Sequence, residues 1–408
     1  MKILFQVVLR MNTTHHPIKS RPMISLLSAQ FLSALADNAL LFAAIALLQA
    51  QLAPNWQIPL LQEFFVLAYI VLAPFVGPFA DSYPKGRVML IANAIKLVGA
   101  SAMLLGLNPL VSYGLVGLGA AAYSPAKYGI LSEMVSREQL VKANAFMEGS
   151  TIVAILLGAV VGGFLASKHL SIALIAVCGC YFVAALMNLL IPKLPAIKPV
   201  ATFAPIALVQ HFKQVLTLLI VQRDARLALF GGSVFWGAGA TLRLLLVAWV
   251  PIALHNSDIS MPANLSGVVA IGIAIGAAMA AKFVRLKDVA RVLPVGISIG
   301  ALIILFAHST HLYVAIGLLI FIGAAGGFYV VPLNALLQQC GHATVGAGNA
   351  VAVQNFFENC SMLILVGFYV LMERNGLPVV RAATIFGCVI FVSIGLIARA
   401  RMQKTSFT

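Results

Sequence analysis

Several ionisable and amide side chains stand inside long apolar stretches of this sequence, where a charge is expensive. Asp37 and Asn38 lie in the middle of an apolar run from Met23 to Ala50, and Arg243 lies in the middle of a later run. Such a run is long enough to cross a hydrocarbon core of about 30 Å as a helix. An ionised group near its centre costs on the order of 2.5–3.5 kcal/mol on insertion scales. These residues therefore indicate a polar site at membrane depth.

A further polar group lies in a run near the end of the chain. Gln354, Asn355, Glu358 and Asn359 are spaced so that one helix would carry them on one face. Glu358 is again close to the middle of its run. Side chains of these types can bind the charged and hydrogen-bonding groups of a polar ligand, and we predict that they do.

The charges also permit a structural explanation. Asp37 and Arg243 occupy matching places in the first and seventh runs, so we expect them to face each other across a central cavity, either as a ligand site or as an ion pair that locks helices together. Lys127 follows Pro125 near one end of its run, where snorkelling explains it as well as ligand binding does. Lys96 lies well inside its run and is expected to be structural.

Composition places the chain in a membrane. Of its 408 residues 62% are hydrophobic and 9% are charged, whereas a soluble domain carries roughly 25% charged residues. The net charge of +15 reflects topology rather than nucleic-acid binding, because Lys and Arg are absent from the alternate loops 51–56, 107–108, 255–261 and 309–310. By the positive-inside rule both termini are predicted to be cytoplasmic. No residues with the spacing of a metal, cofactor or nucleotide site occur.

Apolar windows of about 20 residues predict an all-α integral membrane protein with about twelve spanning helices. The expected organisation is a cytoplasmic tail over 1–22, a six-helix bundle over 23–192, a cytoplasmic loop over 193–226, a second six-helix bundle over 227–399 and a tail over 400–408. Residues 1–10 resemble a truncated signal peptide without a cleavage site and are expected to be disordered or a misassigned start. Part of the long loop is expected to form an amphipathic helix at the interface.

The halves show a weak internal repeat. The stretch AAAYSPAKYGIL has a counterpart in GGFYVVPLNALL, and each contains an intramembrane proline, Pro125 or Pro332. An Asn-Ala pair opens the helix that follows in both halves. Such repeats are typical of transporters that work by alternating access.

The loop after the second run reads GPFADSYPKGR, with Gly77 first, Asp81 four residues later, and Lys85 and Arg87 on either side of Gly86. This pattern resembles the loop signature of the major facilitator superfamily. The resemblance implies two pseudo-symmetric six-helix bundles and a contact in which Asp81 faces a helix N-terminus of the other half. That contact would stabilise the outward-facing state, and Glu148, in the cytoplasmic third of its run, is assigned to the same gating group.

Within the superfamily the chain is similar to the bacterial lysophospholipid transporters. The matching stretches are AQFLSALADNALLFA, ADSYPKGRVM, AAAYSPAKYGIL, WGAGATLR, VPLNALLQ and GAGNAVAVQN. The resemblance implies a monomeric inner-membrane flippase that brings lysophospholipids, chiefly lysophosphatidylethanolamine, to the cytoplasmic leaflet, with lateral access of the lipid. It also implies a functional partner, an acyltransferase/acyl-carrier-protein synthetase that re-acylates them.

The implied substrate explains the polar residues. Arg243 and Lys127 would bind the phosphate, Asp37 and Glu358 would receive the ammonium group, and the amides of Asn38, Gln354, Asn355 and Asn359 would donate hydrogen bonds.

A proton-coupled exporter of drugs or small solutes is the alternative, with Asp37 as proton carrier. The fourth run lacks the Arg that proton antiporters of the superfamily often carry, which favours downhill transport. An acyltransferase is disfavoured because no His is followed by an Asp at the required spacing.

Overall fold

A computed structural model describes residues 20–53, 57–192, 194, 204–255 and 260–402. The expectations for residues 1–10 and for most of both tails lie outside the described residues. Within these ranges the chain is helical and contains no strand. The helices are α2 (Arg21–Ala50), α3 (Gln57–Ser82), α4 (Lys85–Leu104), α5 (Pro109–Met134), α6 (Leu140–Lys168), α7 (Leu170–Leu189), α8 (Pro205–Val221), α9 (Arg223–Ala253), α10 (Ser260–Phe283), the short 3-10 helix η1 (Leu286–Val292), α11 (Leu293–Ala307), α12 (Leu312–Ala343), α13 (Ala347–Arg374) and α14 (Val379–Met402).

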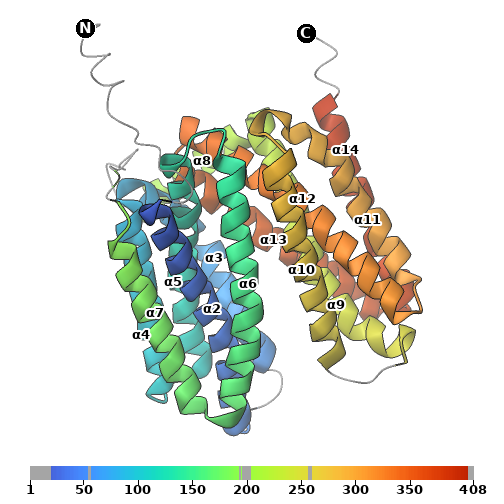
Figure 1. Ribbon diagram of the computed structural model, residues 1–408, viewed down its shortest axis with the longest axis horizontal. Coiled ribbons are helices and arrows are strands. Elements are labelled where there is room, and N and C mark those ends of the chain that lie inside the picture. Colours follow the sequence, from blue (N-terminus) through green and yellow to red (C-terminus); the bar gives the residue numbers. More distant parts are fainter. Residues whose placement is uncertain (1–19, 54–56, 193, 195–203, 256–259, 403–408) are drawn as a thin grey trace, which may run out of the picture.

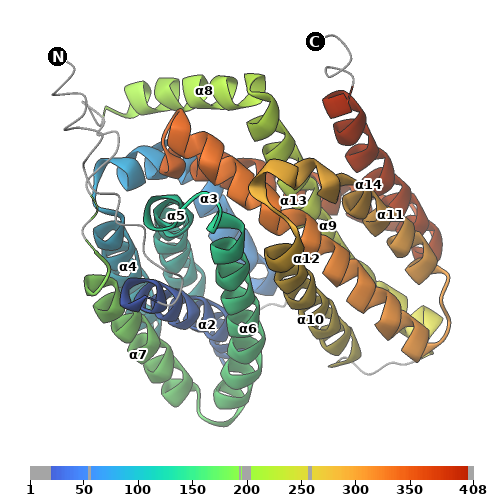
Figure 2. The same ribbon diagram turned by 45° about the horizontal axis from the view of Figure 1, so that its top comes forward.

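The helices form two bundles that stand side by side (Figure 1). We call α2–α7 the first half and α9–α14 the second half. At one end of the molecule α2 begins, α14 ends and α8 lies across the bundle (Figure 2), and we call this end the α8 face. Because successive long helices alternate in direction, α4, α6, α9 and α13 also begin at this face.

Eleven of the described helices are long and apolar enough to span a membrane. The chain is therefore a multi-pass membrane protein. The remaining long helix, α5, is rich in Gly, Ala, Ser and Tyr, which lowers its hydropathy. It contacts helices of both halves and is buried along most of its length, so it does not need an apolar surface towards lipid.

Small residues let the helices approach closely. Added to Gly162 of α6, a Cβ would collide with the backbone of Ala39 in α2, and one on Gly327 of α12 would collide with the backbone of Ile273 in α10. Such contacts are typical of helix pairs in membranes, where dispersion between close backbones replaces the hydrophobic effect. Gly162 and Gly327 are thus explained by close helix contacts.

Helix α8 is the amphipathic segment expected within the long loop. Leu208, Val215 and Leu219 are buried against the protein, whereas Ile206 and Val221 are exposed. A single residue, Gln222, separates α8 from α9.

Candidate substrate site and closing contacts

Asp37 is held inside the first half. Its carboxylate pairs with Nζ of Lys96 on α4 at 2.7 Å and accepts a hydrogen bond of 2.8 Å from the hydroxyl of Tyr181 on α7. The same ammonium donates to Oγ of Ser33, one turn before Asp37. Asp37 therefore forms no described ion pair with Arg243, because a lysine in its own bundle pairs with the carboxylate instead. Lys96 is structural in the sense that it holds this carboxylate.

Arg243 is the contrasting case. No hydrogen bond or ion pair joins its side chain to any described residue, and the residue is exposed within a spanning helix. Gly232, Gly239 and Arg243 share one face of α9 because they are seven and four residues apart. Gly232 faces Glu358, since a Cβ there would stand 3.6 Å from Oε1 of Glu358, and the space beside Gly239 is open. The side of α9 that carries Arg243 thus passes Glu358 at Gly232, and Arg243 lies farther from the α8 face than Glu358 does.

A chain of hydrogen bonds joins Glu358 to the first half. Gln354 donates from Nε2 to Glu358 and to Oδ1 of Asn334, both at 2.7 Å. Asn334 in turn donates to Glu148 of α6 at 3.2 Å, and Glu148 also accepts a 2.7 Å bond from the hydroxyl of Tyr128. Two buried carboxylates, one in each half, are thereby linked through amides.

The other predicted amides divide into two kinds. Asn355 donates from Nδ2 to Oγ of Ser124 at 2.9 Å and so bridges α13 and α5. Asn359 and Asn38 bond to carbonyl groups one turn earlier in their own helices, at 2.7 and 2.8 Å. Asn359 and Asn38 therefore have no contact with the other half among the described hydrogen bonds.

Lys127 is buried on α5, and its ammonium lies 4.1 Å from the ring centre of Tyr128. No carboxylate pairs with it among the described residues. Its place along α5 is about 10 Å from the α8 face, whereas Arg243 is about 30 Å along α9 from that face. The two free cations of the predicted site therefore stand at different depths.

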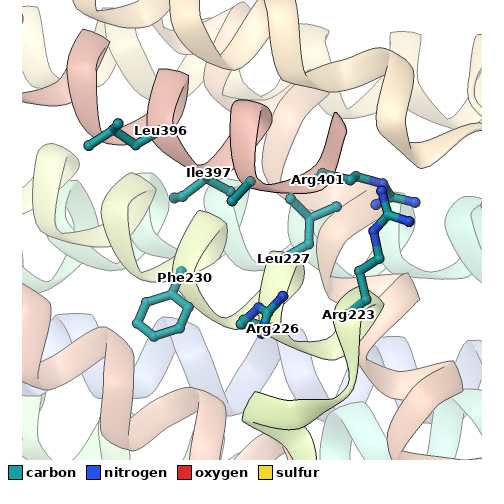
Figure 3. Close-up of a pocket in the computed structure, with 8 residues that line it drawn as sticks. Arg223, Arg226, Leu227, Phe230, Leu396, Ile397 and Arg401 are labelled. Atoms are coloured by element: carbon teal, nitrogen blue, oxygen red, sulfur yellow. The ribbon is translucent and has the colours of Figure 1, made fainter. Parts of the chain in front are cut away.

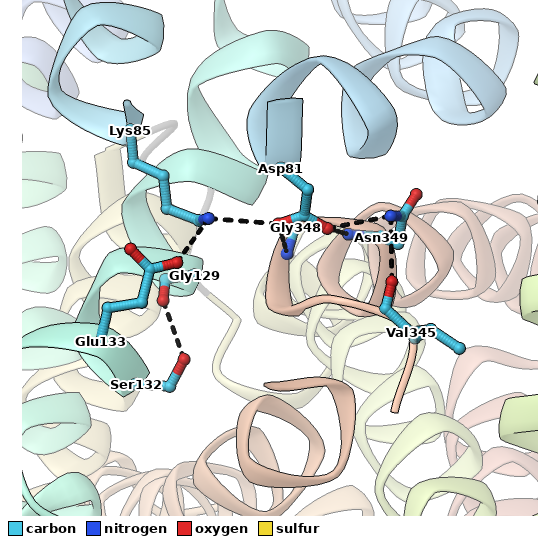
Figure 4. Close-up of polar contacts among 8 residues, drawn as sticks. All are labelled: Asp81, Lys85, Gly129, Ser132, Glu133, Val345, Gly348 and Asn349. Carbon is cyan, nitrogen blue, oxygen red and sulfur yellow. Dashed lines mark hydrogen bonds and ion pairs between the residues drawn. The ribbon is translucent and has the colours of Figure 1, made fainter. Parts of the chain in front are cut away.

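The closing contact predicted for Asp81 is present at the α8 face (Figure 4). Its carboxylate accepts hydrogen bonds of 2.9 Å from the backbone N–H groups of Gly348 and Asn349, at the N-terminus of α13. Asn349 adds a third bond from its side chain. Free N–H groups and the helix dipole make this terminus a favourable place for a carboxylate. The contact joins α3 of the first half to α13 of the second.

Of the other residues of the loop motif, Lys85 and Gly77 take part in this contact, and Gly86 and Arg87 do not. Lys85 pairs with Asp81 at 3.1 Å and with Glu133 of α5 at 2.5 Å, so one ammonium lies between two carboxylates. At Gly77, a Cβ would stand 2.8 Å from the Cα of Asn349, so only glycine permits this approach of α3 to α13. Gly86 packs near Ile191, and Arg87 is exposed without a described partner.

The Asn-Ala pairs of the repeat make matching contacts. Asn144 bonds the carbonyl of Leu140 one turn earlier and exchanges two hydrogen bonds with Gln338 of the second half, at 2.9 and 2.7 Å. Asn349 likewise bonds the carbonyl one turn earlier and reaches Asp81 of the first half. Each half therefore donates one such asparagine to the closure of the α8 face.

Several residues of these networks were not predicted as site residues, among them Tyr128, Glu133, Tyr181 and Asn334. Asn334 carried a usable signal, because it stands two residues after Pro332 just as Lys127 stands two residues after Pro125. The tyrosines gave no signal, since an aromatic residue in an apolar run usually only fills space.

The arrangement of the two halves suits the movement of a ligand. No group of three His, Cys, Asp or Glu side chains within the described ranges is placed to hold a metal ion. Two six-helix bundles close at one end, and charged groups stand between and within them at greater depth. This is the architecture of secondary transporters built from repeats.

The chain belongs to the Major Facilitator Superfamily, whose family model matches residues 26–366. It is similar to the lysophospholipid transporter LplT of Serratia proteamaculans (strain 568), with 54% identity over 362 residues, 88% of this chain and 91% of the relative. The LplT of Yersinia enterocolitica is also 54% identical, over 89% of this chain and 90% of that protein.

Solved structures agree on the fold. The human organic anion transporter MFSD10 superposes with a TM-score of 0.78 at 16% identity, covering 94% of this chain and all of the other. The Escherichia coli fucose:proton symporter FucP superposes with a TM-score of 0.72 at 15% identity, covering 93% and 98%.

Proposed function

We propose that this protein is a lysophospholipid flippase of the bacterial inner membrane, which moves one-chain phospholipids to the cytoplasmic leaflet for re-acylation. Relatives that bear the name lysophospholipid transporter share 54% of its residues over about nine tenths of their length. Both termini, and hence the α8 face, lie in the cytoplasm in this proposal, in keeping with the positive-inside rule. The protein acts as a monomer and not as an enzyme.

The observation that carries the proposal is Arg243, a guanidinium within a spanning helix that no described residue neutralises. A charge kept unpaired at membrane depth needs water or a charged ligand. The phosphate of a lysophospholipid supplies that charge, and a guanidinium binds it through two parallel hydrogen bonds. The acyl chain of the lipid needs no polar partner and remains against apolar helix surfaces or the bilayer.

The other site residues follow the route of the head group. Glu358 stands on the same side as Arg243 but nearer the cytoplasm, and it can receive an ethanolamine ammonium. Lys127 lies nearer to the cytoplasm than Glu358 and offers a point charge to the phosphate. Asp37 is engaged by Lys96, so an ammonium group of the substrate would have to compete with that lysine for it.

Closure at the cytoplasmic end gives the conformation that receives substrate from the periplasmic side. Contacts from Asp81 to α13 and from Asn144 to α12 join the halves there, and the bond between Ser124 and Asn355 lies about 12–15 Å from that end. Opening requires these bonds to break while the halves rock about the site. Lipid access is lateral, between the two halves.

Transport into proteoliposomes tests the proposal. Purified full-length protein is reconstituted, and the appearance of labelled lysophosphatidylethanolamine in the opposite leaflet is followed with and without a proton gradient. We expect lysolipid transfer that continues after an ionophore collapses the gradient, and no transfer of the two-chain phospholipid. Movement of a soluble drug alone would identify the rival exporter, and loss of lysolipid transfer with the gradient would refute downhill transport.

A further inference from the structure

A separate cavity lies at the α8 face, between the first turns of α9 and the last turns of α14 (Figure 3). Its volume is about 240 Å³, and Arg223, Arg226 and Arg401 line it together with apolar side chains. It belongs entirely to the second half. Arg223 is about 30 Å along α9 from Arg243, and Phe230 of the cavity is on a different face of that helix, so this is not the transport site.

The arginines of this cavity have more donors than the protein satisfies. Arg401 pairs with Asp224 at 3.0 Å through one terminal nitrogen, and Arg226 donates to the carbonyl of Ile220 at 3.3 Å. Nε of Arg223 and the other terminal nitrogen of Arg401 are buried and have no hydrogen-bond partner. Buried donors are nearly always paired. Three arginines line the cavity, and the one carboxylate that pairs with any of them among the described residues is that of Asp224, so the charge of the cavity favours an anionic acceptor.

The apolar part of the cavity lies deeper than the charged part. Along α9 the order from the α8 face is Arg223, Arg226 and then Phe230, and along α14 Leu396 stands more than one turn inside Arg401. Phe230 and Leu396 are exposed, at 37% and 60%, on helices that span the membrane. The charged end therefore lies at head-group level and the apolar end at the level of acyl chains.

We propose that this cavity binds an anionic two-chain phospholipid of the leaflet at the α8 face, with its phosphate on Arg223 and Arg401 and an acyl chain along Phe230 and Leu396. Basic pockets between spanning helices suit such head groups. Free phosphate shares the charge but leaves the apolar end uncovered. Only the statement that this leaflet is cytoplasmic rests on the proposed function.

Lipid-dependent thermal unfolding of the purified full-length protein in detergent tests the site. Phosphatidylglycerol is titrated, and phosphatidylcholine and inorganic phosphate are the comparison ligands. We expect phosphatidylglycerol to raise the unfolding temperature of the wild-type protein, and the other two to have little effect. Arg223→Gln weakens the apparent affinity for phosphatidylglycerol about tenfold, the loss of one phosphate contact. Arg399→Gln is the matched control, because it removes a charge from the same end of α14 outside the cavity.

A second variant tests the site independently, in case Arg223→Gln does not fold. Ala400 also lines the cavity, and Ala400→Trp fills it while every arginine remains. We expect this variant to lose the response to phosphatidylglycerol as Arg223→Gln does. Equal effects of Arg399→Gln and Arg223→Gln, a response to phosphatidylcholine as large as that to phosphatidylglycerol, or an equal response to inorganic phosphate would each overturn the proposal. Transport is not the readout, so failure here leaves the proposed flippase untouched.

Discussion

The two halves treat their intramembrane charges in opposite ways. In the first half, Asp37 is neutralised by Lys96 and bonded by Tyr181, all within one bundle. In the second half, no hydrogen bond or ion pair joins Arg243 to a described residue. The helix that takes the place of α4 there is α11, and its sequence, LPVGISIGALIILFA, contains no ionisable residue. The carboxylate Asp37 of the first half is thus paired within its own bundle, whereas the guanidinium of the second half has no described partner.

The repeat sharpens the same contrast. Two residues after the intramembrane proline, the first half has Lys127 and the second half has Asn334. Lys127 has no carboxylate partner among the described residues, whereas Asn334 joins Glu148 to Gln354. The site is therefore asymmetric, with a cation from the first half and an amide bridge from the second.

The largest effect on stability is expected from breaking the pair of the first half. Lys96→Met leaves Asp37 as an uncompensated buried charge, and the loss of one partner of such a pair costs about 3–5 kcal/mol. The free energy of unfolding in mixed micelles measures this. Adding Asp37→Asn to the same protein should recover more than half of the loss, and purely additive effects of the two changes would show that the pair is not coupled.

The matching change in the second half should spare stability and remove function. Arg243→Met takes away a charge that forms no hydrogen bond or ion pair with a described residue and keeps an apolar side chain, so we expect the free energy of unfolding to stay within about 0.5 kcal/mol. Lysolipid transport should fall roughly 10- to 100-fold, because a hydrogen bond to a charged group contributes about 1.5–3 kcal/mol. Arg243→Lys should restore only part of the rate, since the two-pronged contact is lost. Normal transport by Arg243→Met would make the guanidinium a scaffold residue.

These two sites also show what the sequence can and cannot predict. Continuous apolar runs predicted about twelve spanning helices in two six-helix bundles, and the one-turn spacing of Gln354 and Glu358 correctly predicted a shared face, now seen as a 2.7 Å hydrogen bond. The loop motif predicted the contact of Asp81 with a helix N-terminus. Each of these signals is local, or belongs to a pattern that the superfamily shares.

Such signals could not predict which residue pairs with Asp37. Lys96 is 59 residues away, and α2 is apolar nearly all round, so its sequence does not reveal which side faces which neighbour. Interhelical pairing in a membrane depends on rotations that hydropathy does not encode.

The loop carboxylates of the two halves, Asp81 and Asp288, should contribute unequally to the closed population of the α8 face. Asp81→Asn weakens bonds to the N-terminus of α13 by about 1.5–3 kcal/mol, which shifts the population of the closed α8 face about 10- to 100-fold. Asp288 occupies the corresponding loop of the second half, but its one ion pair among the described residues is with the exposed Arg291 at 3.3 Å. Asp288→Asn should therefore shift the population less than about fivefold.

Distances between spin labels on Gln139→Cys and Lys287→Cys, one exposed position in each half at the α8 face, report this population. Equal responses of the Asp81 and Asp288 variants would remove the asymmetry between the two loops.

The smallest effect is expected where the halves meet through uncharged groups. Ser124→Ala removes the hydroxyl that accepts from Asn355 across the interface, a neutral hydrogen bond that contributes about 0.5–1.5 kcal/mol. The closed population should fall about two- to tenfold in the same spin-label measurement. Ser266→Ala is the control, because the one described hydrogen bond of that hydroxyl is to the carbonyl of Pro262 in its own helix. If both serine variants shift the population alike, the effect comes from helix distortion, and the contact between Ser124 and Asn355 does not help to close the α8 face.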